Sequence, residues 1–388
     1  MKKNIKLLFV VNVDWFFISH RLPIALKAIK EGFEVHIACS DTGKKLFLES
    51  QGLIVHTTSF SRSGRNFLDE LVTFMSLRDL MIDSKFDIVH SVTIKSVIYS
   101  GMAIITLKDK PAFVAAISGL GYIFSSTNIT EKLWRLLVSI LYKLALKNRN
   151  KTVIFQNTSD QKTLNSICHL DANDQVLIKG SGVDLEQFIA TSEHTPPPIR
   201  IVMACRLLKD KGVKEFVESA RLLRIQQPHI PLEFILAGDL DTENPNSVTQ
   251  SELDQWKEEG IVNAIGMCKD IPSLFSQSHI IVLPSYYGEG VPKVLIEAAA
   301  CGRPIVTTDT PGCRDCIVDK KTGYLVPPRN AQQLAEKILV LALDEEKRKA
   351  MGKSAREYAE RNFDIQSVIA SHMEIYQSLL DRTLPPLG

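Results

Sequence analysis

The sequence predicts an α/β protein with two parallel-sheet domains, and three observations lead to this prediction. Short apolar runs typical of buried strands alternate with amphipathic helical segments along most of the chain. The length of 388 residues is about what two domains require. Residues 191–198, which include three consecutive prolines, interrupt the alternation and predict a linker.

The first half contains strands that alternate with helices. We expect strands at 5–13, 34–39, 53–57, 86–90, 152–156 and 175–179, and helices at 22–30, 44–50, 68–83 and 131–147. Parallel sheets bind ligands beyond the carboxyl ends of their strands. Residues 12–15, His90 and residues 118–122 are therefore candidates to line a site. No G-x-G-x-x-G follows the first strand, which argues against a dinucleotide enzyme.

The second half repeats this alternation. We expect strands at 199–204, 232–237, 261–265, 280–283 and 303–307, and helices at 213–226, 251–259, 272–277, 331–343, 344–362 and 365–380. A further short helix should begin at Pro292, which suits a first helical position, and stop at Gly302. The predicted domains are thus 1–190 and 191–364, followed by a C-terminal helix at 365–388.

Composition and charge are those of an ordinary globular protein. Hydrophobic residues make up 45% and charged residues 23% of the chain, and no apolar run reaches the ~18 residues that span a bilayer. Residues 1–150 carry a net charge of +8 against +2 for the whole chain, which leaves −6 for the remainder. The basic half is either simply solvated or faces anionic lipid or a phosphate-bearing acceptor.

The seven cysteines are scattered, which fits a reducing compartment. Cys313 and Cys316 form a C-x-x-C, but no second pair lies nearby in the sequence. We therefore expect a structural or incidental role for them rather than a zinc site.

The segment 289–302, E-G-V-P-K-V-L-I-E-A-A-A-C-G, follows a predicted strand and opens the short helix. The N–H groups of a helix N-terminus suit a phosphate. The carboxylates of Glu289 and Glu297 only accept hydrogen bonds, which suits sugar hydroxyls. The two residues are at most ~12 Å apart if the span is helical. One ligand with a sugar at each end of a diphosphate, such as a nucleotide-sugar, could meet both.

Two cations follow another strand of the same domain, in R-L-L-K-D-K-G from Arg206 to Gly212. When a glycosidic bond to a diphosphate breaks, negative charge gathers on the leaving group, and fixed cations there stabilise it. Arg206 offers a planar fork and Lys211 a compact charge. Taken singly each residue reads as a surface cation, but their placement after a strand, together with the Glu pair, predicts a donor site.

These motifs resemble those of a known family. E-G-V-P with a second Glu at the eighth position, then A-A-A-C-G-R-P-I-V, resembles the E-x7-E signature of retaining nucleotide-sugar glycosyltransferases of GT-B type, family 4. R-x-x-x-x-K-G resembles the same family's diphosphate motif. The resemblance covers essentially all 388 residues and is most specific at 199–328. It implies two Rossmann-like domains facing across a cleft, the first for the acceptor and the second for the nucleotide-sugar, with the last helix crossing back to the first domain.

The resemblance also implies roles for single residues. Glu289 would contact the donor sugar's hydroxyls, Glu297 the ribose, and Arg206 and Lys211 the diphosphate, so that Glu289, Arg206 and Lys211 form the catalytic set. The remaining donor contacts implied are Gly290, Val291, Pro292, Met267, Cys268 and Ile271, the last three in a loop under the nucleotide base. UDP is the expected nucleotide by family frequency. No cofactor or metal is expected, and the D-x-D of Asp239 and Asp241 is assigned to a loop rather than to manganese.

The first domain departs from the family's common pattern. Asp14 lies in a segment where many relatives carry Gly-Gly, and Ser118 stands where many carry His. Candidate acceptor or sugar contacts are Asp14, His20, His90, Ser118 and Gly119. Structural roles compete for three of them: hydrogen bonding inside the fold for His90, and surface or capping positions for Asp14 and His20. Losing the His does not exclude activity, because in a retaining reaction a leaving-group oxygen can take the acceptor proton.

The expected activity is transfer of a hexose or N-acetylhexosamine from a UDP-sugar to a growing saccharide. The segments D-W-F-F-I-S-H-R and S-G-L-G-Y look most like bacterial members, N-acetylgalactosaminyltransferases among them, that extend undecaprenyl-diphosphate-linked sugars for O-antigen of lipopolysaccharide, capsule or protein glycosylation. This implies a cytoplasmic enzyme, peripheral on the inner membrane, with no nucleic-acid partner. The apolar helix 131–147, with Trp134 and several basic residues, either lies on that membrane or is a core helix.

Two other functions are open to such a fold. A nucleotide-sugar epimerase would form an epimer from the UDP-sugar without any acceptor. A non-catalytic nucleotide-sugar-binding subunit of an assembly complex would bind UDP but show no turnover with any lipid-linked acceptor.

Overall fold

The computed structural model describes residues 4–58, 60, 67–121, 129–193, 197–242 and 244–383. The chain forms two compact units, one of Met1–Ser181 with Gln366–Gly388 and one of Gly182–Ile365. The second unit begins earlier than the expected residue 191. Val183 pairs with Asp364 in an isolated bridge, and the side chain of Phe188 is buried in the second unit's core, so these residues belong to that unit.

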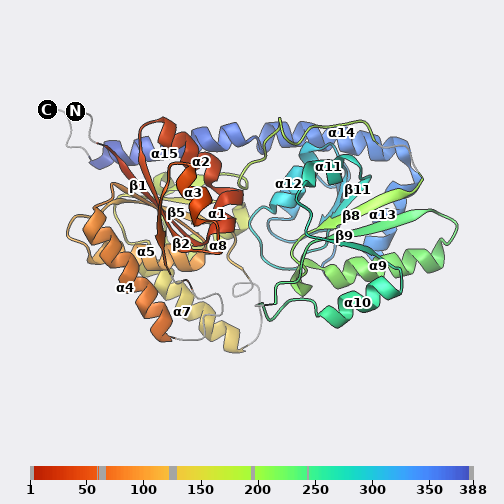
Figure 1. The fold of residues 1–388 in the computed structure, drawn as a ribbon, viewed down its shortest axis with the longest axis horizontal. Helices are drawn as coiled ribbons and strands as arrows, with labels where there is room; N and C mark the ends of the chain where they lie inside the picture. The colour runs from red at the N-terminus through yellow and green to blue at the C-terminus, as the bar shows by residue number, and fades with distance from the viewer. Residues whose placement is uncertain are drawn as a thin grey trace. The chain divides into compact units, whose positions relative to one another are not determined.

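The first unit is built on a parallel sheet of seven strands in the order β3-β2-β1-β4-β5-β6-β7 (Figure 1). Its strands are β1 (Lys6–Val13), β2 (Glu34–Ser40), β3 (Ile54–Thr57), β4 (Ile88–Val92), β5 (Ala112–Ile117), β6 (Lys151–Phe155) and β7 (Gln175–Leu177). The central strands are buried on both faces, as expected for a parallel sheet covered by helices.

Helices cover both faces of this sheet. They are α1 (Asp14–His20), α2 (Leu22–Lys30), α3 (Lys45–Ser50), α4 (Phe67–Ser84), α5 (Ile94–Thr106), α7 (Ile129–Ala145), α8 (Thr158–Cys168) and α15 (Ile365–Thr383). Helix α5 packs against β1, β4 and β5 and is flanked by α4 and α7. Figure 1 shows α15 on the opposite side of the sheet, where Tyr376 bonds to His90 of β4.

The second unit is built on a parallel sheet of six strands in the order β10-β9-β8-β11-β12-β13. Its strands are β8 (Ile199–Ala204), β9 (Leu232–Ala237), β10 (Asn263–Gly266), β11 (Ile280–Leu283), β12 (Ile305–Thr308) and β13 (Gly323–Val326). Its helices are α9 (Val213–Gln226), α10 (Gln250–Glu258), α11 (Ile271–Ser276), α12 (Lys293–Ala300), α13 (Ala331–Leu343) and α14 (Glu345–Asn362).

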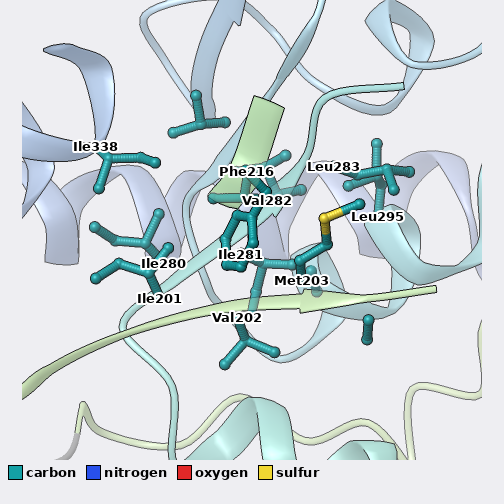
Figure 2. Close-up of a cluster of buried hydrophobic side chains, with 14 of the residues drawn as sticks. Ile201, Val202, Met203, Phe216, Ile280, Ile281, Val282, Leu283, Leu295 and Ile338 are labelled. Atoms are coloured by element: carbon teal, nitrogen blue, oxygen red, sulfur yellow. The ribbon is translucent and has the colours of Figure 1, made fainter. Parts of the chain in front are cut away.

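The core of the second unit sits between this sheet and its helices. Figure 2 shows side chains of β8 and β11 packed with Phe216 of α9, Leu295 of α12 and Ile338 of α13, all of them buried. Each fully buried side chain of this size stabilises the fold by about 1.5–3 kcal/mol relative to exposure. The core therefore fixes β8, β11 and α12, whose ends carry the predicted site.

The predicted fold class is confirmed: both units are parallel sheets with helices on both faces. Helices α1, α5 and α8 and strands β5 and β13 lie outside the ranges expected from the sequence. Among the described residues, none of the helices combines the length and hydrophobicity needed to cross a bilayer.

Candidate active site

Two loops of the second unit meet at the carboxyl edge of its sheet. Strands β8 and β11 are neighbours, so residues 205–212 after β8 lie beside residues 284–292 after β11. The backbone N–H of Tyr286 and the hydroxyl of Ser285 both donate to the carbonyl oxygen of Asp210, at 3.0 and 3.1 Å. The loop carrying Arg206 and Lys211 is thereby joined to the loop carrying Glu289.

Two glycines allow close backbone packing at this edge, one at the end of the loop after β8 and one in the segment after β12. Gly212 has φ +80°, and a Cβ there would lie 2.2 Å from the carbonyl oxygen of Pro284. Gly312 has φ +83°, and a Cβ there would lie 1.7 Å from the carbonyl oxygen of Gly290. Only glycine fits positions of positive φ at such close approach. The backbone at residues 289–290 can therefore lie where it does only because residue 312 is a glycine and has no side chain.

Lys211 and Glu289 form an ion pair at this edge. Lys211 Nζ lies 2.5 Å from Glu289 Oε2, and the two side chains are only 18% and 12% exposed. Burial lowers the pKa of Lys211, but the Glu289 carboxylate outweighs this effect, so the pKa lies above its ordinary value. The other carboxylate oxygen, Glu289 Oε1, is buried without a hydrogen-bond partner among the described residues. A buried acceptor of this kind is costly unless a donor arrives.

Glu297 lies one turn into α12. The helix begins at Lys293 with Pro292 as its N-cap residue, so the predicted start at Pro292 was one residue early. Its end is followed by Gly302 in the left-handed region, as predicted. Burial raises the pKa of Glu297 to about 7, and Lys293, 3.6 Å away, opposes the rise. The carboxyl group therefore titrates near neutrality.

Arg206 is held by a residue that sequence reasoning had placed in a loop. Its Nη1 donates to Asp241 Oδ2 at 2.7 Å, while half of the Arg206 side chain stays exposed. Asp241 follows β9, the other neighbour of β8. The signal in the sequence was the D-x-D itself, whose function as an anchor for the arginine follows only from the strand order.

Asp210 is a second acid that sequence reasoning did not single out. Burial raises the pKa of its carboxyl group, with the charge of Lys211 opposing the rise. Its Oδ1 is buried without a partner among the described residues, and its Oδ2 accepts from Asn246 at 3.4 Å. Lys211 is therefore paired with Glu289 and is also close enough to Asp210 for their charges to interact, while burial favours the neutral form of Asp210.

The loop expected under a nucleotide base follows β10 at the same edge. Met267 is exposed, Cys268 Sγ donates to the Asp270 carbonyl oxygen at 3.4 Å, and Ile271 begins α11. The carbonyl of Gly266 accepts from Gly238 N at 2.8 Å, which ties this loop to the one after β9. The second unit therefore gathers the predicted donor residues along one sheet edge, and their roles toward a ligand stay predictions.

Two of the candidate contacts in the first unit are buried and hydrogen-bonded inside the fold, which favours the structural role that the sequence left open for each. Asp14 is 1% exposed and accepts from Thr42 N and Oγ1, both at 2.6 Å, and from Lys44 N at 3.2 Å. It anchors the loop after β2. His90 is fully buried in the middle of β4, and its Nδ1 lies 2.6 Å from the hydroxyl oxygen of Tyr376. Neither side chain is accessible to a substrate.

Other candidates of the first unit lie in different environments. His20 stacks on Phe16 with ring centroids 4.2 Å apart. Ser118 follows β5, and its hydroxyl is buried without a partner among the described residues, beside Gly119 at φ +106°. Thr93, which the sequence did not mark, has φ +82° after β4, a rare conformation for a β-branched residue. Ser118, Gly119 and Thr93 thus lie at the carboxyl ends of neighbouring strands, and Tyr122 lies outside the described residues.

In the part of the chain that the structure describes, no group of three or more His, Cys, Asp or Glu side chains is placed so that it could hold a metal ion. Cys313 and Cys316 are free and fully buried, and Cys316 Sγ donates to the carbonyl oxygen of Gly312 at 3.3 Å.

Comparison with known proteins identifies the family of this chain. Two parallel-sheet units with helices on both faces are the fold of a glycosyltransferase of GT-B type. Residues 184–358 match the model of the glycosyl transferases group 1, and residues 6–157 match that of the glycosyl transferase 4-like family. The chain belongs to the GT-B glycosyltransferases that combine these two parts.

Two curated relatives extend over nearly the whole chain. An N,N'-diacetylbacillosaminyl-diphospho-undecaprenol alpha-1,3-N-acetylgalactosaminyltransferase of Campylobacter jejuni is 30% identical, over 94% of this chain and 98% of the relative. The capsular polysaccharide biosynthesis glycosyltransferase CapM of Staphylococcus aureus is 25% identical, over 97% of this chain and 98% of its own length.

Solved structures share the fold. Alr3699/HepE of Anabaena in complex with UDP superposes with a TM-score of 0.76 at 18% identity, over 96% of this chain and all of that one. Sucrose-phosphate synthase of Thermosynechococcus elongatus superposes with a TM-score of 0.80 at 16% identity, over 98% of this chain and all of that one.

Proposed function

We propose that this glycosyltransferase moves a hexose or N-acetylhexosamine from a UDP-sugar, with retention of anomeric configuration, to an undecaprenyl-diphosphate-linked saccharide in bacterial surface glycan assembly. The observation that carries the proposal is the Lys211–Glu289 pair with its vacant acceptor, Glu289 Oε1. The name of the Campylobacter jejuni relative, which states transfer of N-acetylgalactosamine to a diphospho-undecaprenol saccharide, supports the choice of sugar class and acceptor.

The pair suits the two halves of a nucleotide-sugar at the bond that breaks. A hydroxyl of the donor sugar donates to Glu289 Oε1, the oxygen that has no partner. Lys211, on the other oxygen, faces the diphosphate together with Arg206. Both cations stabilise the negative charge that builds on the leaving diphosphate, which is the largest kind of catalytic contribution that a fixed charge makes.

Retention follows from chemistry in which acceptor and leaving group share one face of the sugar. The acceptor hydroxyl attacks the anomeric carbon as the bond to the diphosphate breaks, and its proton passes to an oxygen of the departing diphosphate. No protein base is needed for this step, which is consistent with a first unit whose His90 is sealed in the core. Arg206 and Lys211 take the place of a metal, so we propose metal-independent transfer.

A membrane surface is the proposed place of action. Helix α7 exposes large apolar side chains, with Leu133 71% and Trp134 59% exposed, and others follow at Leu136, Leu137, Ile140 and Leu144. A soluble surface seldom carries such a row, whereas an interfacial helix requires one. This pattern favours the interfacial alternative over a core helix, and supports peripheral contact with the cytoplasmic face of the inner membrane.

Screening UDP-sugars with isolated lipid-linked saccharides tests the proposal. We expect transfer from a UDP-hexose or UDP-N-acetylhexosamine to a diphosphate-linked acceptor, a product of retained configuration by NMR, and unchanged turnover in EDTA. Epimer formed from the UDP-sugar without acceptor would refute transfer in favour of epimerisation. Binding of UDP without turnover on any lipid-linked acceptor would point to a non-catalytic subunit.

A further inference from the structure

Helix α7 carries three parallel stripes of side chains. At 100° per residue, Val138, Tyr142 and Ala145 fall on one stripe and are buried, on a helix that packs against α5 and α8. Leu133, Leu137, Ile140 and Leu144 fall on another and are exposed. Between them lies a polar stripe of Lys132, Arg135 and Ser139. The polar stripe thus borders the exposed apolar stripe along the length of the helix.

The polar stripe forms one wall of a surface pocket between α7 and α8. The pocket has a volume of about 450 Å³ and is lined by Lys132, Arg135, Leu136, Ser139, Thr163, Ser166 and Ile167. Its size is in the range of small-ligand sites. Leu136 lines the pocket and is also exposed beside the apolar stripe, so the pocket opens directly onto that stripe.

The lining of the pocket is cationic. It contains two cations, three hydroxyls and, among the described residues that form it, no carboxylate. Lys132 and Arg135 make no ion pair or hydrogen bond to another described residue, whereas Lys151 of the same unit is paired with Asp174 at 2.7 Å. Thr163 and Ser166 already donate to helix carbonyls, at 2.9 and 2.7 Å, so the donors left for a ligand are Lys132, Arg135 and Ser139.

We propose that this pocket binds the diphosphate of the lipid-linked acceptor, with the start of the lipid chain lying on the apolar stripe of α7. A diphosphate offers adjacent anionic oxygens, which match a lysine and an arginine fork one turn apart. An apolar chain leaving the diphosphate meets Leu136 and then the stripe of Leu133, Leu137 and Ile140. A small anion would contact the two cations but not the apolar stripe. An uncharged apolar ligand would contact the stripe but not the cations.

The assignment deepens the proposed function and depends on it for the identity of the ligand. It gives the acceptor's diphosphate a site of its own, distinct from the edge of the second unit where Arg206 and Lys211 face the donor diphosphate. Each cation lost from such a contact removes a charge-assisted hydrogen bond, so removing both should weaken binding by about tenfold to a hundredfold.

Binding of farnesyl diphosphate to the full chain tests the pocket. The variant is Lys132→Ala with Arg135→Ala, and the charge-matched control is Arg149→Ala with Lys162→Ala, two exposed cations outside the pocket lining. We expect the pocket variant to bind farnesyl diphosphate at least about tenfold more weakly than wild type. The control and the UDP affinity of all three proteins should be unchanged. Inorganic pyrophosphate should bind wild type at least about tenfold more weakly than farnesyl diphosphate, because it lacks the chain.

Other outcomes would overturn the assignment. Equal binding of farnesyl diphosphate by wild type and the pocket variant would remove the diphosphate from this pocket. Equal binding of pyrophosphate and farnesyl diphosphate would remove the lipid chain from the stripe. Loss of binding only to phosphatidylglycerol vesicles would assign the two cations to the general membrane surface. Failure of the proposed function appears separately: farnesyl diphosphate would then bind through Lys132 and Arg135 while no UDP-sugar is transferred to any lipid-linked acceptor.

Discussion

The two units carry polar residues at the same place, the carboxyl ends of their strands, but use them differently. In the second unit, Lys211 and Glu289 pair with each other and leave Glu289 Oε1 without a donor. In the first unit, Asp14 directly follows β1, and both of its carboxylate oxygens accept hydrogen bonds from backbone N–H groups, including those of the loop after β2. A strand-end carboxylate that keeps an oxygen without a donor is therefore the stronger candidate for a ligand contact.

The strongest way to break this comparison is to remove the pair in the second unit. We expect Lys211→Ala or Glu289→Ala to lower turnover by at least ~100-fold, the loss typical of a transition-state contact. The measurement is kcat with the UDP-sugar and acceptor identified by the screen. Lys214→Ala, which removes an exposed lysine on α9, is the matched control and should stay within about twofold of wild type. Near-wild-type turnover in either site variant would refute the assignments.

A smaller effect is expected at the residue that holds Arg206. Asp241→Asn removes the ion pair at 2.7 Å and should lower kcat/KM for the donor by about tenfold, because the guanidinium is no longer fixed. Asp239→Asn is the control within the same D-x-D and should stay within about twofold. Higher donor affinity in Asp241→Asn would instead show that Asp241 competes with the diphosphate. Equal losses in both variants, with recovery on adding manganese, would indicate a metal site.

In the second unit, Glu297 should make the affinity for the donor depend on pH. Its pKa of about 7 in the free protein means that it becomes protonated below neutrality, whereas the ribose contact predicted for it requires the ionised form, because only that form accepts from both oxygens. Donor affinity should therefore fall as the pH falls, by about fivefold between pH 7 and pH 6. Glu297→Gln should bind the donor weakly at both pH values and flatten the profile. A wild-type affinity that is constant over this range would separate Glu297 from the ribose.

The smallest effect on turnover is expected in the first unit. Asp14→Ala should lower the free energy of unfolding by about 2–4 kcal/mol, because it leaves the N–H groups of the loop after β2 without their acceptor. Turnover per folded molecule should change by less than about twofold. Asp109→Ala, at an exposed position, should change the free energy of unfolding by no more than about 0.5 kcal/mol and turnover by less than about twofold. A large loss of turnover without a loss of stability would restore Asp14 as a substrate contact.

The alternation of strands and helices could be read from the sequence because buried parallel strands are short continuous apolar runs. Helix α5 was not predicted because its sequence, I-K-S-V-I-Y-S-G-M-A-I-I-T, contains β-branched residues that favour strands. Packing against β1, β4 and β5 overrides that preference. Strand β13 has four residues, too few for a periodic pattern. Helix α1 begins directly after β1, without a polar cap to mark it.

The donor motifs could be recognised because their residues occupy loops at fixed spacing after strands. The residues around these motifs could not be recognised from the sequence. Asp241 contacts Arg206 only because β9 lies beside β8 in the sheet, and the pKa of Asp210 is raised only because its carboxyl group is buried. For His90 the sequence left two roles open. The structural role is favoured by burial under α15, which lies nearly 300 residues further along the chain and could not be placed there from the sequence.

Gly312 controls the position of the backbone at residue 289, although it would not be found among residues that contact a ligand. Any side chain at 312 would collide with the carbonyl oxygens of Gly290 and Glu289, so it would displace the acid without meeting the sugar. A mutational scan scored on activity would rank this glycine beside the residues that touch the donor. The loss of activity on substituting Gly312 would measure how precisely the backbone at residues 289–290 must be positioned, separately from the chemistry of the Glu289 side chain.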